Sequence, residues 1–351
     1  MAQANFGGYD QLSAALAETF REYVDDNVFI SNMVFQRGWQ DAEKVDQGRF
    51  LSLPIQSGKN QTAQSFGSYD EVNSSPQSTL SVAAFPWSFY TAAVMLDYQT
   101  LSLNRGPNTR VNLIAQQLQT AIASLADVCG QDLCQYAGGT PSLGAKAPGT
   151  ANAQPAFGIV EATDDGTVVN SYGNITRTGA GSFVNWAGND IRKLTQAGIG
   201  TATNDAPPSL FYALYNNSVQ GLQVPTEVYT SKQGVASYMY ALQAQQRLSP
   251  GDIANVGFAG AKLFAAEIMA DDHVINVPGT VATNLGANFF AINRNHTRFF
   301  YFGEKGFDFV PWVDAQTVIA KVCRYVTSFQ FCSSQPRTGG QLLNVNVVFN
   351  L

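Results

Sequence analysis

Charged residues are scarce in this chain of 351 residues. Asp, Glu, Lys and Arg together make up 13% of it, about half the share found in average soluble proteins. The apolar share of 45% is ordinary, so Asn, Gln, Ser, Thr and Gly fill the deficit. Charged side chains are depleted at the cores of protein–protein interfaces, so this composition favours a protein that buries much of its surface against other chains. A secreted protein with a polar surface is the alternative.

Long apolar runs and basic clusters are also missing. No apolar stretch approaches the roughly 18 residues that a membrane-spanning helix needs, so we expect no contact with a membrane. The N-terminal residues lack the basic and apolar regions of a signal peptide. The net charge is −6 and no run of basic residues occurs. This argues against a protein that coats nucleic acid, because phosphate binding needs clustered Lys and Arg.

Histidine is rare, which limits general-base and metal chemistry. The two histidines are His273 and His296. Asp271 and His273 could face the same side of a strand, but we interpret this segment as a solvated turn rather than a metal site. His296, in the sequence NRNHTR, is interpreted as a turn residue between two strands.

Cysteine is almost as rare, with four residues: Cys129, Cys134, Cys323 and Cys332. Their spacings match no standard zinc pattern, and we expect reduced, mostly buried thiols in a cytoplasmic product. Ser182 and Ser231 lie in no Gly-x-Ser-x-Gly elbow, and the Gly-rich stretches lack phosphate-loop spacing. We therefore predict that the chain is not an enzyme and has no catalytic residue, cofactor or metal ion. The tryptophans at 87, 186 and 312 are expected to be core or interface anchors rather than a sugar platform.

The longest periodic segment runs over residues 108–137. Apolar residues recur at helical spacing: Val111, Ile114, Leu118, Ile122, Leu125 and Val128. Asn108-Thr109 can cap its start and Gly138-Gly139 can end it. Gly130 costs about 1 kcal/mol relative to Ala inside a helix. A helix that continues through it spans about 45 Å, which indicates a strut.

Residues 48–90 predict a long two-stranded excursion. An extended run begins at Phe50, residues 56–77 are almost wholly polar, and a second run follows in which Phe85, Trp87 and Phe89 alternate. A polar tip of some 20 residues is unusual inside a compact domain. We interpret it as a flap that projects from the body, with a flexible surface loop as the alternative.

The remaining segments predict one amphipathic helix at the N-terminus, a mixed α/β region and a strand-rich end. The first helix has its apolar stripe at Leu12, Leu16, Phe20 and Val24. In the mixed region, helices are predicted at 182–197, 208–220 and 231–247, and strands at 224–229 and within 258–277. Strands are then predicted at 288–292, 298–303, 307–311, 317–331 and 341–349, with a turn-rich link at 333–340.

The segment at 308–345, DFVPWVDAQTVIAKVCRYVTSFQFCSSQPRTGGQLLNV, resembles the C-terminal segment of the major capsid proteins of tailed bacteriophages. In that family a strand ends in Pro, a short turn with an acidic residue and Ala follows, and a long strand leads to a Pro-Arg-Gly-like link. The segment at 256–278, VGFAGAKLFAAEIMADDHVINVP, is similar to the family's strand pair ending in an acidic turn. The order of arm, polar flap, long helix and inserted region also agrees.

The resemblance implies an α+β structure, the HK97-like capsid fold. Its parts would be an N-terminal arm at 1–47, an extended β-hairpin loop at 48–90, a peripheral domain at 91–150 and 290–351 with a spine helix at 108–137, and an axial domain at 151–289.

The function implied is that of a structural major capsid protein, which assembles into the pentamers and hexamers of an icosahedral phage head enclosing double-stranded DNA. Assembly would take place in the host cytoplasm and the product would be the virion capsid. DNA would be enclosed without sequence-specific binding, and portal, scaffolding and decoration proteins would be further partners. Some family members begin with a charged helical leader that acts as a fused scaffold, and this sequence has none.

Candidate residues for contacts between subunits follow from the flap and the arm: Phe20, Lys59, Asn60, Phe66, Tyr69, Asp70 and Glu71. Some family members cross-link Lys to Asn, and Lys59 beside Asn60 raises that idea, although no motif here supports it. Two alternatives stay open. One is an encapsulin-like bacterial nanocompartment shell protein of the same fold, and the other is a secreted hydrolase or carbohydrate-binding protein.

Overall fold

The fold is seen in a computed structural model that describes residues 32–46, 48–103, 113–136, 143, 145–147, 149, 153–178, 186–192, 208–243, 261–278, 285–303, 307–315 and 318–346. The helices are α2 (Met33–Gln40), α3 (Tyr98–Leu103), α4 (Leu113–Cys134), α5 (Ile159–Thr163), α6 (Pro208–Ser218), α7 (Lys232–Gln243) and the 3-10 helix η3 (Pro336–Thr338). The strands are β1 (Glu43–Val45), β2 (Phe50–Gln56), β3 (Leu80–Pro86), β4 (Ser88–Asp97), β5 (Ser171–Tyr172), β6 (Ile175–Thr176), β7 (Asn189–Arg192), β8 (Glu227–Thr230), β9 (Lys262–Leu263), β10 (Ala266–Ala270), β11 (Val277–Pro278), β12 (Leu285–Ile292), β13 (Thr297–Phe302), β14 (Phe307–Asp314), β15 (Ala320–Ser333) and β16 (Gly340–Asn346).

The predicted strut is α4, a continuous helix that passes through Gly130. The start and stop expected at residues 108–109 and 138–139 lie outside the described residues. Gly130 has a packing reason, because a Cβ there would stand 2.1 Å from the side-chain amide of Asn32. Asn32 donates a hydrogen bond from Nδ2 to the carbonyl of Ala126 at 2.7 Å and caps α2 by accepting from the N–H of Phe35. The glycine therefore lets the start of α2 lie directly on α4.

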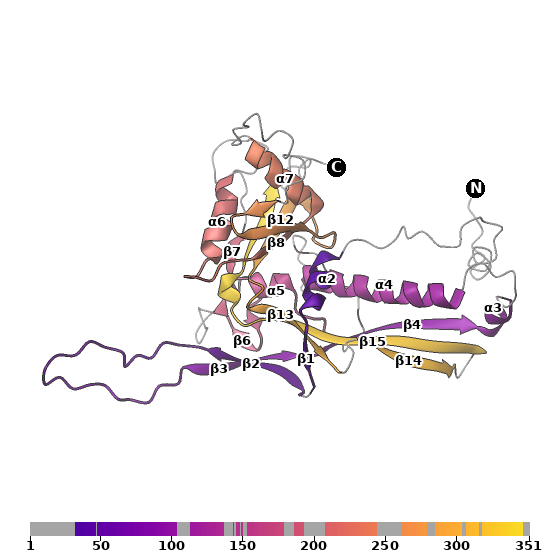
Figure 1. The fold of residues 1–351 in the computed structure, drawn as a ribbon, viewed down its shortest axis with the longest axis horizontal. Coiled ribbons are helices and arrows are strands. Elements are labelled where there is room, and N and C mark those ends of the chain that lie inside the picture. The colour runs from indigo at the N-terminus through magenta and orange to yellow at the C-terminus, as the bar shows by residue number, and fades with distance from the viewer. Residues whose placement is uncertain are drawn as a thin grey trace.

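One face of a five-stranded sheet packs on α4 and forms a flat plate with it (Figure 1). The central strand is β15, which pairs with β4 on one side and with β13 and β14 on the other. The small core between sheet and helix contains Val94, Leu96, Ala121 and Cys323.

A seven-stranded sheet forms the second part of the body, with strand order β7-β16-β12-β8-β10-β9 and β11 beside β12. Helices α6 and α7 pack on it around a core that includes Phe211 and Phe289, whose rings meet edge to face at 5.0 Å. In Figure 1 this part rises above one end of the plate. A turn at residues 293–296 carries the chain from β12 in this sheet to β13 in the plate, and it includes His296, as the sequence predicts.

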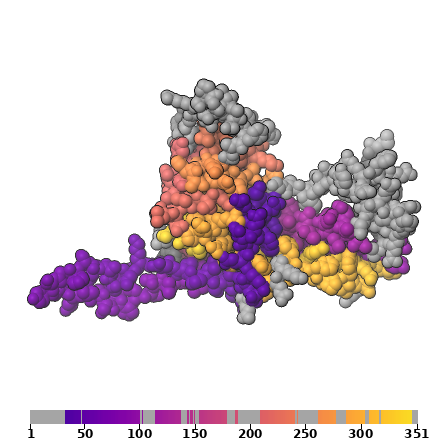
Figure 2. All heavy atoms as spheres, viewed as in Figure 1, coloured from indigo at the N-terminus to yellow at the C-terminus, as the bar shows by residue number. Residues whose placement is uncertain are grey.

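The flap is confirmed as an antiparallel hairpin of β2 and β3, joined by residues 57–79, which contain neither helix nor strand. It projects away from the body in Figures 1 and 2. Leu51 and Phe85 on one face of its root are buried. Gly173 has a φ of +58°, and a Cβ there would lie 2.7 Å from the ring of Phe85. This turn between β5 and β6 thus requires glycine both for its backbone and for its contact with the flap root.

Three expectations need correction. The segment predicted as a helix at 182–197 contains β7, which pairs in parallel with β16, and its residues 182–185 and 193–197 lie outside the described residues. The expected peripheral domain includes residues 290–351, but β16 within this range lies in the seven-stranded sheet. The second half of the predicted arm is also part of the body, since β1 pairs in parallel with β13 and Phe35 of α2 is buried among aromatic rings.

The other predicted elements of the mixed and strand-rich regions correspond to α6, α7, β8, β9–β11 and β12–β16. The predicted N-terminal helix with Phe20 lies outside the described residues. Among the described helices, none has the length and apolar character needed to cross a membrane.

Candidate assembly surfaces

The flap tip, residues 57–79, carries all the described contact candidates, and every one of them is exposed. Phe66 and Tyr69 are the large apolar or aromatic side chains among them, with Tyr69 fully exposed. Lys59 lies nearer the root, where it lines a hollow of about 370 Å³ together with Trp186 and Arg337. The structure therefore places these candidates along one projecting segment, while Phe20 lies outside the described residues.

A preformed turn presents Tyr69 at the tip. The carboxylate of Asp70 accepts a hydrogen bond from the N–H of Gly67 at 2.6 Å, and the N–H of Asp70 donates back to the carbonyl of Gly67. Tyr69 has a φ of +74°, in the left-handed region that is strained for a residue with a side chain. An ordered turn that projects an unburied aromatic ring is suited to contact with another molecule.

The flap root has an unpartnered apolar face. Register in the hairpin places Val82 opposite Pro54 and Pro86 opposite Phe50, and residues directly opposite each other share one face of a sheet. Leu80, Val82 and Phe50 are mostly or half exposed on this side, while the other side packs on the body. The root is thus apolar on both faces but covered on only one.

The plate also has an unpartnered apolar face, on the side of its sheet away from α4. Met95 of β4 and Val313 of β14 both pair with Val322 of β15, so the three side chains form a row on that side. Met95 and Val313 are each 61% exposed. Phe89 lies on the same side of β4, six residues before Met95, and is 65% exposed.

Sequence reasoning missed this second surface. Alternation in Phe85, Trp87 and Phe89 suggested a single strand with all three rings on one side. The chain instead changes strand at Trp87, so Phe85 and Trp87 are buried and Phe89 faces outward. The alternation of Phe89, Thr91, Ala93 and Met95 places these side chains on one side of β4, but it does not say whether that side is covered.

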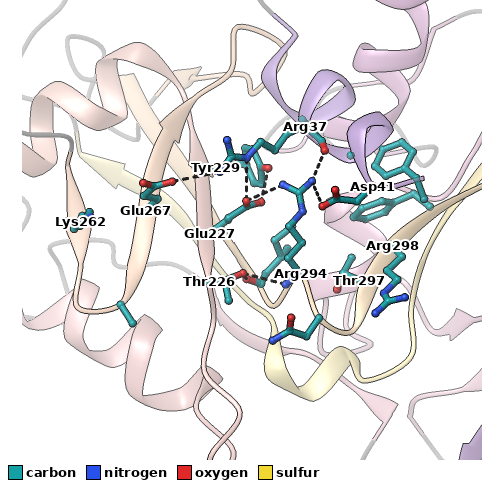
Figure 3. A pocket seen from close by; sticks show the side chains of 17 residues that line it. Arg37, Asp41, Thr226, Glu227, Tyr229, Lys262, Glu267, Arg294, Thr297 and Arg298 are labelled. Carbon is teal, nitrogen blue, oxygen red and sulfur yellow. Dashed lines mark hydrogen bonds and ion pairs between the residues drawn. The ribbon is translucent and has the colours of Figure 1, made fainter. Parts of the chain in front are cut away.

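A cavity of about 630 Å³ lies where α2 meets the seven-stranded sheet (Figure 3). The buried carboxylate of Glu227 pairs with Arg37 at 3.3 Å and Arg294 at 2.9 Å, and accepts a hydrogen bond from the hydroxyl of Tyr229 at 2.7 Å. Arg294 also pairs with Asp41 at 2.6 Å. Burial, with the charge of Glu227, raises the pKa of Tyr229 well above its ordinary value. These contacts tie α2 to the sheet, and each charged group named here already has a partner of opposite sign.

The interpretation of His273 as a solvated turn residue is wrong. Its side chain is 4% exposed and lies between two carboxylates, with Nδ1 at 3.3 Å from Oδ1 of Asp271 and Nε2 at 2.9 Å from Oδ1 of Asp127. Sequence reasoning could not place Asp127 there, because it comes from the middle of α4. Within the part of the chain that the structure describes, no three His, Cys, Asp or Glu side chains are arranged to hold a metal ion.

The expected burial of the cysteines and of two of the tryptophans is confirmed. All four cysteines are free and buried, and burial raises the pKa of each thiol, so none has the character of a reactive thiolate. Trp87 and Trp186 are buried in the core, where Trp186 donates from Nε1 to the carbonyl of Tyr172 at 2.8 Å. Trp312 is partly buried against the plate core.

Comparison with known proteins identifies the fold. No protein-family model and no curated protein matches the sequence. Solved structures match over almost the whole chain. The capsid asymmetric unit of cyanophage A-1(L) is 9% identical with a TM-score of 0.62, covering 94% of this chain and 97% of that one. The SrpI encapsulin complex from Synechococcus elongatus is 10% identical with a TM-score of 0.57, covering 96% of both. The capsid of a native GTA particle is 12% identical with a TM-score of 0.55, covering 98% and 99%.

The fold class is therefore an α+β fold shared by phage capsid and encapsulin structures. More narrowly, it is the HK97-like fold that the resemblance in the sequence implies.

Proposed function

We propose that the chain is a shell-forming structural protein, the major capsid protein of a tailed phage, which assembles into pentamers and hexamers of an icosahedral head. The observation that carries this proposal is the pair of unpartnered apolar faces on one subunit. One is the outer face of the flap root, with Phe50, Leu80 and Val82, and the other is the outer face of the plate, with Phe89, Met95 and Val313. Contiguous exposed apolar surface on a soluble chain marks a site of interaction.

The two faces cannot cover each other within one subunit, since both are exposed in it. We infer that the flap root of one copy lies on the plate of the next. Such a contact joins two different patches, and repeated contacts of this kind close into rings when the rotation between copies allows it. The flap projects beyond the body (Figure 2), and this supports the arrangement because a projecting flap would extend the reach of a subunit over its neighbour.

The flap tip extends the same contact. Lys59, Asn60, Phe66, Asp70 and Glu71 are proposed to bind the neighbouring copy, together with Tyr69. Most are polar, so hydrogen bonds and shape would set the register of the contact while the apolar root supplies most of the burial. Each contact is modest, but every subunit makes several, and their sum holds a closed shell.

Two regions of the body are proposed to act as the peripheral and axial domains of the fold. The plate, with α4 and the strands from 88–97 and 297–333, would be peripheral. The seven-stranded sheet, including β16, would be axial. Portal, scaffolding and decoration proteins, and DNA inside the shell, belong to this proposal as partners. We propose no catalytic role, and the capsid and encapsulin folds give no support to a secreted hydrolase.

The test is to express the full chain without a tag and examine it by negative-stain electron microscopy and analytical sedimentation. We expect closed, uniform particles. A chain that stays monomeric or forms only small oligomers at high concentration would contradict shell formation.

The encapsulin-like alternative is favoured by one observation, the match to the SrpI encapsulin over 96% of both chains. The two functions differ in what the particles contain. Particles isolated from the natural source would hold double-stranded DNA if the chain is a phage capsid protein, and protein cargo if it forms a nanocompartment.

A further inference from the structure

A single histidine joins two parts of the body. His273 lies just after β10 of the seven-stranded sheet and contacts Asp127 of α4 through Nε2. Its other ring nitrogen faces Asp271, whose second oxygen, Oδ2, accepts a hydrogen bond from the N–H of Val34 in α2 at 2.8 Å. The side-chain amide of Gln135 also donates to the carbonyl of His273. The seven-stranded sheet and α4 therefore meet at one imidazole ring, and the start of α2 is joined to this site through Asp271.

Both ring nitrogens of His273 face groups that only accept hydrogen bonds. Neutral imidazole carries one N–H and so can donate to one carboxylate, while its second nitrogen presents a lone pair to the other. Imidazolium carries two N–H groups and can donate to Asp271 and Asp127 together. The number of protons on the ring therefore decides how many of these contacts are made.

The charged and titratable groups around the ring favour the imidazolium. From α4 they are Asp127 and Cys134, and the Cys134 thiol is hydrogen-bonded to Asp271. From the turn itself they are Asp271 and Asp272, the latter paired with Lys232 of α7 at 2.9 Å. From α2 the contact is a backbone N–H. Burial alone would lower the pKa of His273, but the hydrogen bonds and charges of the two aspartates outweigh it and raise the pKa.

We propose that His273 is a proton-operated latch between the seven-stranded sheet and α4. The imidazolium closes it by donating to both aspartates, and loss of one proton opens it by breaking the contact with Asp127. The opening takes place at Asp127 because that side chain is 37% exposed, so water can replace the histidine. Asp271 is fully buried and keeps the remaining N–H. The latch does not depend on the proposed function, since all of its parts belong to one chain.

The direction of the pH effect follows from the raised pKa. The stabilisation of the folded chain by protonated His273 is fully present below the ordinary histidine pKa of about 6.5. It is lost as the pH rises through the higher pKa that His273 has in the folded chain. The junction between α4 and the seven-stranded sheet is thus tight below the ordinary histidine pKa and loosens as the pH rises through the raised pKa of His273.

The experiment follows both the proton and the junction in the full-length protein. Slow exchange of the imidazole C2 proton, measured by mass spectrometry, reports the titration of each histidine. His296 is an internal reference, because burial, with nearby arginines, lowers its pKa. We expect the midpoint of His273 to lie above 6.5 and that of His296 below it. A midpoint of His273 at or below that of His296 would overturn the proposal.

Backbone hydrogen exchange, corrected for the intrinsic effect of pH, reports the junction. Protection of residues 126–134 should fall roughly ten- to hundredfold as His273 loses its proton, the effect of losing one hydrogen bond to a charged group. In Asp127→Asn the side-chain amide can accept a hydrogen bond from the protonated ring and donate one to the neutral ring. The contact then survives in both protonation states, so the pH-dependent step in protection should vanish. If that variant does not fold, His273→Gln serves the same purpose, because its side chain has no proton to lose. A step that is absent in the wild type, or that persists in a variant, contradicts the latch.

Discussion

The hydroxyl of Tyr90 donates a hydrogen bond to Oδ2 of Asp132 at 2.7 Å, which joins the plate strand β4 to α4. The same hydroxyl accepts the N–H of Ala156 at 2.8 Å, and Asp132 also accepts the N–H of Ala147. A single phenol thus satisfies a buried carboxylate and a backbone donor from a third segment.

Replacing this phenol by Phe should destabilise the chain. Tyr90→Phe leaves both partners without the hydroxyl, and an unsatisfied buried polar group costs roughly 1–3 kcal/mol. The free energy of unfolding, measured in urea on the unassembled chain, should fall by about that amount. The matched control is Tyr98→Phe, at a mostly exposed ring, which should change it little. Equal effects of the two substitutions would contradict the buried role of Tyr90.

The buried ion pair between Lys146 and Glu161 gives a second stability test. Nζ lies 2.6 Å from Oε1, and the two side chains are 5% and 3% exposed. Lys146→Met leaves a carboxylate buried without its cation, which should cost roughly 3–5 kcal/mol. Adding Glu161→Gln removes the charge while the amide oxygen can still accept the N–H of Gly158. Thermal melts should show the double variant more stable than Lys146→Met alone, and no recovery would count against this account.

The apolar face of the plate should be required for assembly and not for folding. Met95→Asp places a charge on this face at a side chain that is 61% exposed in the single chain. We expect a cooperative melt close to that of the wild type and no closed particles by sedimentation. Met95→Leu keeps the surface apolar and should assemble. Normal particles from Met95→Asp would show that this face remains solvent-exposed in the assembled particle.

The flap tip should also be required for assembly and not for folding. The tip has few apolar side chains to bury and no regular structure of its own. Replacing residues 59–77 by a short Gly-Ser turn should leave a soluble chain that melts cooperatively but forms no shells. Thermal melts and sedimentation compare the two forms. Normal shells from the shortened chain would refute the role of the tip, and an unfolded chain would show that it belongs to the core.

Local patterns predicted much of the fold. The helical stripe of α4 repeats within a few residues, the polar flap is a continuous polar segment, and β12 to β15 are short apolar runs between turn residues, so local sequence places all of them. β7 was missed because its only described strand partner, β16, comes about 150 residues later in the chain. His273 was misjudged for the same reason, since Asp127 lies 146 residues before it. Contacts of this separation have no local signature.

The candidate surfaces were only half predictable. The flap tip stands out because long polar segments are rare between strands. The outer face of the plate does not stand out in the sequence. An apolar side chain in β4 is buried or exposed according to which side of the sheet α4 covers. Only the packing of α4 shows that Val94 faces inward and Met95 outward.

The place of β16 in the seven-stranded sheet has a consequence for biosynthesis. Within the described sheet order, β16 lies between β7 and β12, so β7 joins the sheet only through it. Domains form from the N-terminal side as the ribosome adds residues, yet this sheet stays in two pieces until translation reaches residue 346. An interrupted translation product therefore lacks the strand that unites the sheet. Under the proposed function, such a product would not present a complete seven-stranded sheet to a growing particle.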